Sequence, residues 1–140
     1  MTTVATRWEV GTRLSLDAGR ITRSTLALFA GGSGDHNPIH LDVDVARSAG
    51  MDDVFAQGML SMAYLGRLLT DHVPQAAIRS LTTRFVAITP VGVEPTCTAE
   101  VVAVDAGLAT LDLQVVLADG TLTLAGQAIV SVVDTLEGQA

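Results

Sequence analysis

The sequence contains few of the residues on which several common classes of protein depend. It has one cysteine, Cys97, so no disulfide can form within the chain. Eight Lys and Arg residues against fifteen Asp and Glu residues give a formal net charge of -7. A nucleic-acid-binding face needs clustered positive charge to neutralise phosphates, so binding to nucleic acid is not expected. An anionic membrane surface is disfavoured for the same reason.

Long apolar runs are also missing. No segment approaches the run of about 18 apolar residues that a membrane-spanning helix needs, and the first eight residues lack the apolar core of a secretion signal. We therefore expect a cytoplasmic protein that does not associate with membranes. Aromatic residues make up only 4% of the chain and hydrophobic residues 49%, so the core must consist mainly of aliphatic side chains.

The length of 140 residues suits a single domain over residues 1–140. Helical signals concentrate between residues 21 and 73. Thr22 can cap a short helix that the glycine-rich residues 31–34 end, and Asp42 can cap a second one that ends near residue 49. A longer helix is expected from about residue 59 to residue 72, before Pro74.

This longer helix predicts the overall arrangement. Its apolar residues, which cover most of its surface, are Leu60, Met62, Ala63, Leu65, Leu68 and Leu69. A helix this apolar normally lies buried. Only the second half of the chain can enclose it, and four strand-like runs occur there, at residues 78–88, 95–104, 108–117 and 121–132. Alternation of apolar and polar residues and an Asp-Gly turn predict antiparallel pairing. We therefore expect an α+β fold in which an antiparallel sheet curls around one helix.

A polar segment, residues 34–40 with the sequence GDHNPIH, separates the first two predicted helices. Pro38 lacks an N–H and restricts Asn37 to extended conformations, so the segment cannot be a regular helix. The loop is expected to be stiff and to present Asp35 and His40 from its two ends. A carboxylate and an imidazole placed in this way can form an acid–base pair.

Residues 29–46, which begin FAGGSGDHNPIH and end at Ala46, resemble the signature of the MaoC-like family, which includes the R-specific enoyl-CoA hydratases. The signature fixes Gly, Asp, Asn, Pro and His at set spacing, so it is more specific than an Asp and a His alone. The resemblance implies a hot-dog fold, in which a curved antiparallel sheet wraps around a long central α-helix. It also implies a homodimer.

The resemblance further implies hydration of trans-2-enoyl thioesters to (R)-3-hydroxyacyl thioesters, or the reverse dehydration. The substrate would be carried on coenzyme A or on an acyl carrier protein. Asp35 and His40 match the catalytic pair that holds one water, with Asp35 as the base and His40 helping to deliver a proton to C2. The backbone N–H of Gly58, at the start of the long helix, matches the donor to the thioester oxygen.

Three more residues are candidates for the substrate side of the site. Asn37 either braces the loop or contacts the site, and Ser33 is a candidate for a hydrogen bond within it. Gln57 stands where many relatives carry His before the glycine. This difference keeps the backbone donor of Gly58 but removes any role that requires an imidazole at position 57.

Two alternatives remain within the same fold. Hot-dog thioesterases cleave the same class of ester, and other members serve as subunits of hetero-oligomeric dehydratases. No metal or other cofactor is expected. His36 and His40 have the spacing of a metal-binding pair on a helix face, but Pro38 rules out a helix here.

Overall fold

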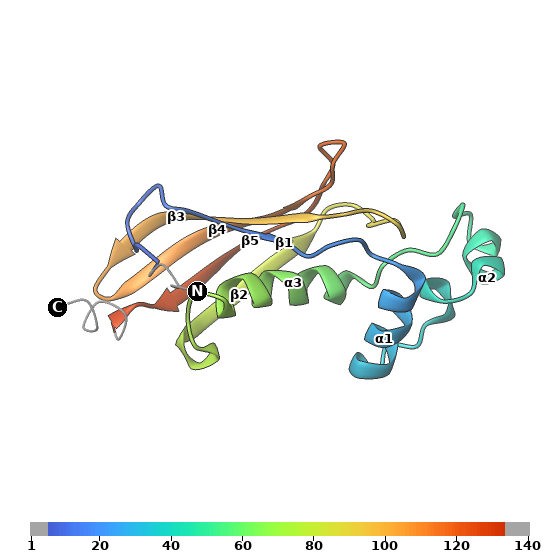
Figure 1. The fold of residues 1–140 in the computed structure, drawn as a ribbon, viewed down its shortest axis with the longest axis horizontal. Coiled ribbons are helices and arrows are strands. Elements are labelled where there is room, and N and C mark those ends of the chain that lie inside the picture. The colour runs from blue at the N-terminus through green and yellow to red at the C-terminus, as the bar shows by residue number, and fades with distance from the viewer. Residues whose placement is uncertain (1–5, 134–140) are drawn as a thin grey trace.

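In a computed structural model of the protein, which describes residues 6–133, five strands form one curved antiparallel sheet. The strands are β1 (Arg13–Asp17), β2 (Ile78–Phe85), β3 (Thr96–Asp105), β4 (Leu108–Val116) and β5 (Leu122–Ser131). Their order across the sheet is β1-β3-β4-β5-β2, so β1 and β2 are edge strands. The long helix α3 (Gly58–Thr70) lies along the concave side (Figure 1). This confirms the predicted α+β architecture.

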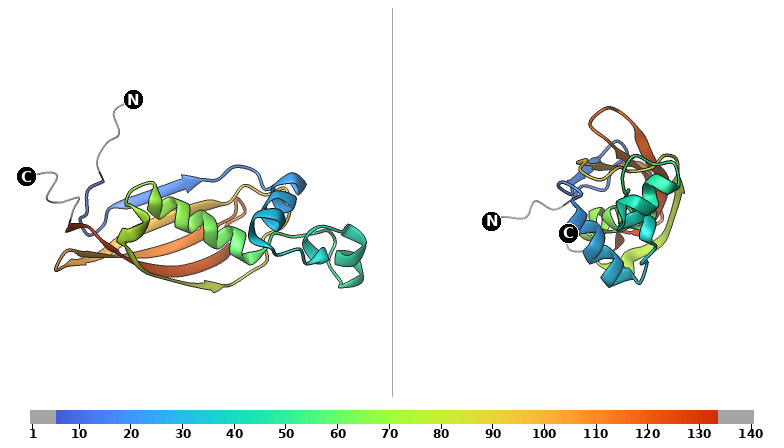
Figure 2. Two further views of the ribbon diagram at one scale, coloured as in Figure 1. Left: turned by 90° about the horizontal axis from the view of Figure 1, so that it is seen from below. Right: turned by 90° about the vertical axis from the view of Figure 1, so that its right-hand side faces the viewer.

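The other helices gather beyond the N-terminal end of α3. They are α1 (Arg23–Ser33), the 3-10 turn η1 (Pro38–His40) and α2 (Val43–Ser48), and Figure 2 shows them at one end of the sheet. A second 3-10 turn, η2 (Gln75–Ala77), connects α3 to β2. The first residues of the chain, for which a secretion signal was considered, lie partly outside the described residues.

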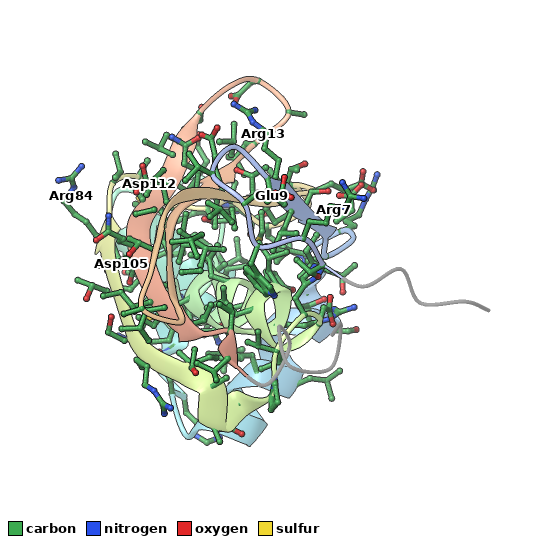
Figure 3. All side chains as sticks on the ribbon, turned by 90° about the vertical axis from the view of Figure 1, so that its left-hand side faces the viewer. Arg7, Glu9, Arg13, Arg84, Asp105 and Asp112 are labelled. Carbon is green, nitrogen blue, oxygen red and sulfur yellow. The ribbon has the colours of Figure 1, made fainter. Side chains whose placement is uncertain are left out.

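The sheet covers one side of α3. Leu65, Leu68 and Leu69 are buried against the strands within the main core, and Figure 3 shows side chains filling the space between helix and sheet. On the other side of α3, Met59 is 54% exposed and Ala63 is exposed as well. The prediction that the helix is buried on most sides therefore holds for only one face within this chain. The five-stranded sheet does not curl far enough to enclose the opposite face of α3.

A second, smaller core holds the end of the molecule that contains α1 and α2. Its fully enclosed members include Ile21 before α1, Leu26 in α1, Ala46 in α2 and Leu60 in α3. Arg23 at the start of α1 also donates two hydrogen bonds to the Asp53 carboxylate, at 3.0 and 2.5 Å. These bonds hold the pKa of Asp53 below its usual value. The second core therefore fixes α1 and α2 against the beginning of α3.

Local capping explains the ends of the helices. Thr22 caps α1 as predicted, since its hydroxyl accepts from the N–H of Thr25 at 3.1 Å. The helix was expected to end within residues 31–34. It continues to Ser33 and ends at Gly34, which adopts a left-handed conformation with φ 81°. Hydrogen bonding to preceding carbonyls offsets the low helix propensity of the glycines. Asp42 caps α2 as predicted.

The four later strands lie within three residues of their predicted bounds. β2 ends at Phe85 rather than near residue 88, because the N–H groups of Val86 and Ala87 both donate to the carbonyl of Thr123. Two donors on one carbonyl interrupt the regular ladder.

Cys97 on β3 is fully buried, and burial raises the pKa of its thiol to about 11. Cys97 is therefore a packing residue of the main core. Among residues 6–133, no helix has the length and apolarity needed to cross a membrane.

Gly126 sets the spacing between β5 and β2. A Cβ atom at this position would lie 2.2 Å from the carbonyl oxygen of Thr82. We expect Gly126→Ala to lower the free energy of unfolding by about 1 to 3 kcal/mol, because the backbone of β2 must move away. Denaturant unfolding followed by circular dichroism measures the change.

The matched control is Gly32→Ala, at a helical glycine where an added Cβ would meet no atom within 4 Å. This substitution should leave stability unchanged or raise it by up to about 1 kcal/mol. Equal stability of Gly126→Ala and the wild type would show that the spacing between β5 and β2 is not as described.

Candidate active site

The loop between α1 and α2 is held by short-range hydrogen bonds from side chains to the backbone. The N–H of Asp35 donates to Ser33 Oγ at 3.1 Å, and the N–H of Asn37 donates to Asp35 Oδ1 at 3.3 Å. The N–H of Ile39 donates to Asn37 Oδ1 at 3.2 Å. Each bond closes a turn of the kind that Ser, Asp and Asn favour. The loop is therefore rigid for a local reason, and the contact seen for Asn37 is a bracing one.

His40 is fixed by a residue far from it in the sequence. Its Nδ1 atom lies 2.7 Å from the carbonyl oxygen of Phe55, and the Phe55 ring packs edge-on against the imidazole with centroids 5.0 Å apart. A carbonyl oxygen can only accept, so Nδ1 must be the protonated nitrogen. In neutral His40 the other nitrogen, Nε2, is therefore left as an acceptor.

The free nitrogen of His40 faces Asp35. The distance from His40 Nε2 to Asp35 Oδ2 is 3.9 Å. This is too long for a direct hydrogen bond, but one small oxygen atom can lie within hydrogen-bond distance of both groups. The His40 residue is only 9% exposed, whereas the Asp35 side chain is 45% exposed. The imidazole is thus sheltered, and the carboxylate is open to a reactant.

A mainly apolar cavity of about 500 Å³ lies next to Asp35. Its lining residues come from α1, the loop, α3 and β2, and they are Phe29, Ser33, Asp35, Met59, Met62, Ala63, Gly66 and Leu81. Ser33 is thus on the cavity wall, but its hydroxyl is engaged, since it donates to the carbonyl of Phe29 at 2.6 Å.

Gly58 borders a second apolar cavity, of about 290 Å³. It is the first residue of α3, and the first N–H groups of a helix have no partner within the helix. The residue before it, Gln57, provides no side-chain cap. A Cβ at Gly58 would lie 2.9 Å from the ring of Phe85, which also lines this cavity. The glycine therefore lets the ring approach and leaves a donor at the positive end of the helix dipole.

The Gln57 side chain takes a different direction from the one predicted. It is 1% exposed, and its Nε2 atom donates to the carbonyl of Leu26 in α1 at 3.1 Å. It lines neither of the two cavities described above. The parts played by Phe55 and Phe85 were not anticipated from the sequence either. Phe55 acts through its backbone carbonyl, which every residue possesses, so no sequence signal distinguishes it.

Comparison with known proteins connects this geometry to a family. The family described as the MaoC like domain matches residues 7–123.

The chain belongs to the MaoC-like family. The (R)-specific enoyl-CoA hydratase of Aeromonas caviae is 32% identical over 126 residues, which cover 87% of this chain and 93% of that protein. The mitochondrial 3-hydroxyacyl-acyl-carrier-protein dehydratase FERN of Solanum lycopersicum is 33% identical over 100 residues, or 67% of this chain. The chain spans 59% of the length of the Solanum protein.

Solved structures agree with this assignment. The structure of the (R)-hydratase from A. caviae matches with a TM-score of 0.81 and 30% identity, over 88% of this chain and 96% of that one. The unliganded R-hydratase PhaJ1 from Pseudomonas aeruginosa matches with a TM-score of 0.79 and 28% identity, over 88% and 81%. The hot-dog fold expected for a MaoC-like protein is therefore confirmed. The family is one of hydratases and dehydratases.

The two possible roles of Asn37 can be separated by a pair of variants. Asn37→Ala removes the acceptor for the N–H of Ile39 and should cost about 1 kcal/mol of unfolding free energy. Asn37→Asp keeps an acceptor oxygen in the same place and should retain most of that stability. Urea unfolding of the three proteins measures both effects. If Asn37→Asp is as unstable as Asn37→Ala, the stability depends on the amide N–H₂ group and not on the hydrogen bond that Asn37 Oδ1 accepts from Ile39.

Proposed function

We propose that this MaoC-like protein adds water to trans-2-enoyl thioesters to give (R)-3-hydroxyacyl thioesters, and that it catalyses the reverse dehydration. The proposal is supported above all by the placement of Asp35 Oδ2 at 3.9 Å from His40 Nε2. A carboxylate and a neutral imidazole nitrogen, both acceptors, face each other across a gap that suits one water. The family membership makes this reaction class the natural one to test.

The two acceptors orient the water for attack. One hydrogen of the water points to Asp35 and the other to His40 Nε2, so a lone pair of the oxygen is directed towards C3 of the substrate. Asp35 takes a proton as the oxygen bonds to C3, and the electron pair of the double bond moves through C2 to the thioester oxygen. A proton then returns to C2 from the Asp35–His40 pair. The sum is the addition of one water with no net change of protons on the enzyme.

The developing charge on the thioester oxygen needs a donor in place before reaction, and the Gly58 N–H at the start of α3 supplies it. The acyl chain occupies the apolar cavity beside Asp35, where Met59, Met62 and Leu81 provide aliphatic contacts. Coenzyme A or an acyl carrier protein carries the thioester. Asp35, His40 and Gly58 thus act as base, water-holding partner and oxyanion donor.

The proposal is tested by incubating the purified protein with crotonyl-CoA and following the loss of the enoyl-thioester absorbance. Asp35→Asn and His40→Gln should each lower the rate by at least ~100-fold, the usual scale for a positioned acid or base. His40→Asn is a sharper variant, because its amide can still donate to the Phe55 carbonyl while nothing replaces Nε2. It should be inactive and still folded by circular dichroism.

His36→Gln is the control from the same loop. The His36 imidazole is exposed, and its one side-chain hydrogen bond within the described residues is with the carbonyl of Gly34. This variant should keep the wild-type rate within about threefold. Normal rates in folded Asp35→Asn or His40→Gln would overturn the mechanism. Release of free thiol from a saturated acyl-CoA, without hydration of the enoyl substrate, would instead establish the thioesterase alternative.

We also propose that two copies of the chain associate through the open side of the site. Exposed apolar residues gather there, with Met59 at 54%, Phe85 at 52%, and Val86 and Ile88 nearly as exposed. β2, which leads into this segment, is an edge strand. We expect a homodimer by light scattering after gel filtration, and Val86→Glu should shift it towards monomer. A wild-type mass of one chain at micromolar concentration would contradict the homodimer.

A further inference from the structure

Two buried polar atoms close to the site have no hydrogen-bond partner among residues 6–133. They are Gln57 Oε1 and Ser61 Oγ. Both residues are almost completely removed from solvent. Buried polar groups in native proteins are normally paired, so two orphans in adjacent turns of one helix require an explanation.

The direction of the Gln57 amide is determined by its partner. Nε2 donates to the carbonyl of Leu26, which cannot donate in return. Nε2 must therefore face α1, and Oε1 must face the other way. Ser61 follows Gln57 by four residues, and side chains four residues apart on a helix lie on the same face. No hydrogen bond joins the two atoms in this structure.

The hydrogen bond from Gln57 joins the two elements that carry the proposed reacting groups. Leu26 belongs to α1, whose C-terminal end leads directly into Asp35. Gln57 immediately precedes Gly58. Within the described residues, no other side-chain hydrogen bond connects α1 to the residues that begin α3. The remaining contacts there are made by apolar side chains such as Leu60, which pack without a preferred direction.

Gln57 also leaves the first turn of α3 open. The usual residues before a helix are Ser, Thr, Asp or Asn, whose side chains bond the first N–H groups. Gln57 occupies this position, but its side chain is turned towards α1 and makes no cap. The amide is thus used to join two helices and not to cap α3.

We propose that Gln57 is a positioning residue. Its amide, bonded to the Leu26 carbonyl, sets the distance between Asp35 and the Gly58 N–H. The proposal rests on the function proposed above, in which these two groups act on the same substrate molecule. It predicts a loss of turnover without a matching loss of substrate binding, because the substrate's contacts remain while the alignment of base and oxyanion donor does not.

The central variant is Gln57→Met, which keeps the length of the side chain and removes both hydrogen-bonding groups. We expect kcat on crotonyl-CoA to fall about 10- to 100-fold, as displacements of the order of 1 Å commonly cause, with KM changed less than about threefold. Gln57→His retains an N–H that can reach the Leu26 carbonyl and should restore most of the lost kcat.

Thr123→Val is the matched control. Thr123 is also buried, and its hydroxyl donates to the carbonyl of Val115 at 3.2 Å, inside the sheet. The substitution removes one buried bond from a side chain to a carbonyl, as Gln57→Met does, but it leaves the hydrogen bond between Gln57 and α1 intact. Its kcat should stay within about twofold of the wild type. Unchanged kcat in Gln57→Met, or an equal fall in Thr123→Val, would overturn the positioning role.

Hydrogen exchange provides a readout that needs no activity. Amides in residues 26–40 and 57–61 should exchange faster in Gln57→Met than in the wild type and Thr123→Val, since the hydrogen bond between α1 and the start of α3 is lost. Unchanged exchange in these peptides would overturn the proposal even if the enzyme is active. If the wild type hydrates none of the thioesters tested, the proposed function fails, and the exchange result alone decides whether Gln57 positions α1.

Discussion

The hydrogen bond from His40 Nδ1 to the carbonyl of Phe55 is the contact on which the rest of the site depends. It selects the protonated nitrogen of the imidazole and so leaves Nε2 facing Asp35 as an acceptor. Phe55 is itself anchored to the segment after β2, since it forms a bridge with Pro90 and the next residue, Ala56, donates to the carbonyl of Thr89 at 2.9 Å. Two backbone contacts with the segment after β2 therefore hold the carbonyl that orients the imidazole.

The two cores have different tasks. The main core, between α3 and the sheet, stabilises the helix as a support and contains aliphatic side chains almost throughout. The smaller core fixes α1 and α2 against the beginning of α3, where Gly58 lies. Apolar contacts provide stability there but little directional control. Directional control comes from a few polar contacts, among them Arg23 with Asp53 and Gln57 with Leu26.

The open face of α3 links the fold to the proposed assembly. A helix with apolar residues on most sides, packed on a five-stranded sheet, leaves part of its apolar surface uncovered. In this chain that surface includes Met59 and continues into the cavity beside Asp35. Met59, one of the residues that would favour association with a second copy, therefore also borders the space proposed for the acyl chain.

Features that depend on near neighbours could be predicted from the amino-acid order, whereas the meeting of distant groups could not. Thr22 and Asp42 cap their helices, and Asn37 and Pro38 shape the loop, because in each case the partner is only a few residues away. The loop motif also identified the family and hence the fold, in agreement with the match over residues 7–123. Local backbone geometry and capping depend on residue type, so these features are visible in the chain itself.

The contacts that complete the site depend on how the elements pack. His40 bonds a carbonyl fifteen residues away, and Gln57 bonds one thirty-one residues away. The acceptors are backbone carbonyls, which have no residue signature. From the sequence, Gln57 was expected on the substrate side of the site; in the structure its side chain is directed at α1. Only the packing of α1 against the start of α3 brings a carbonyl within reach of that amide, and this packing is not encoded in any one segment.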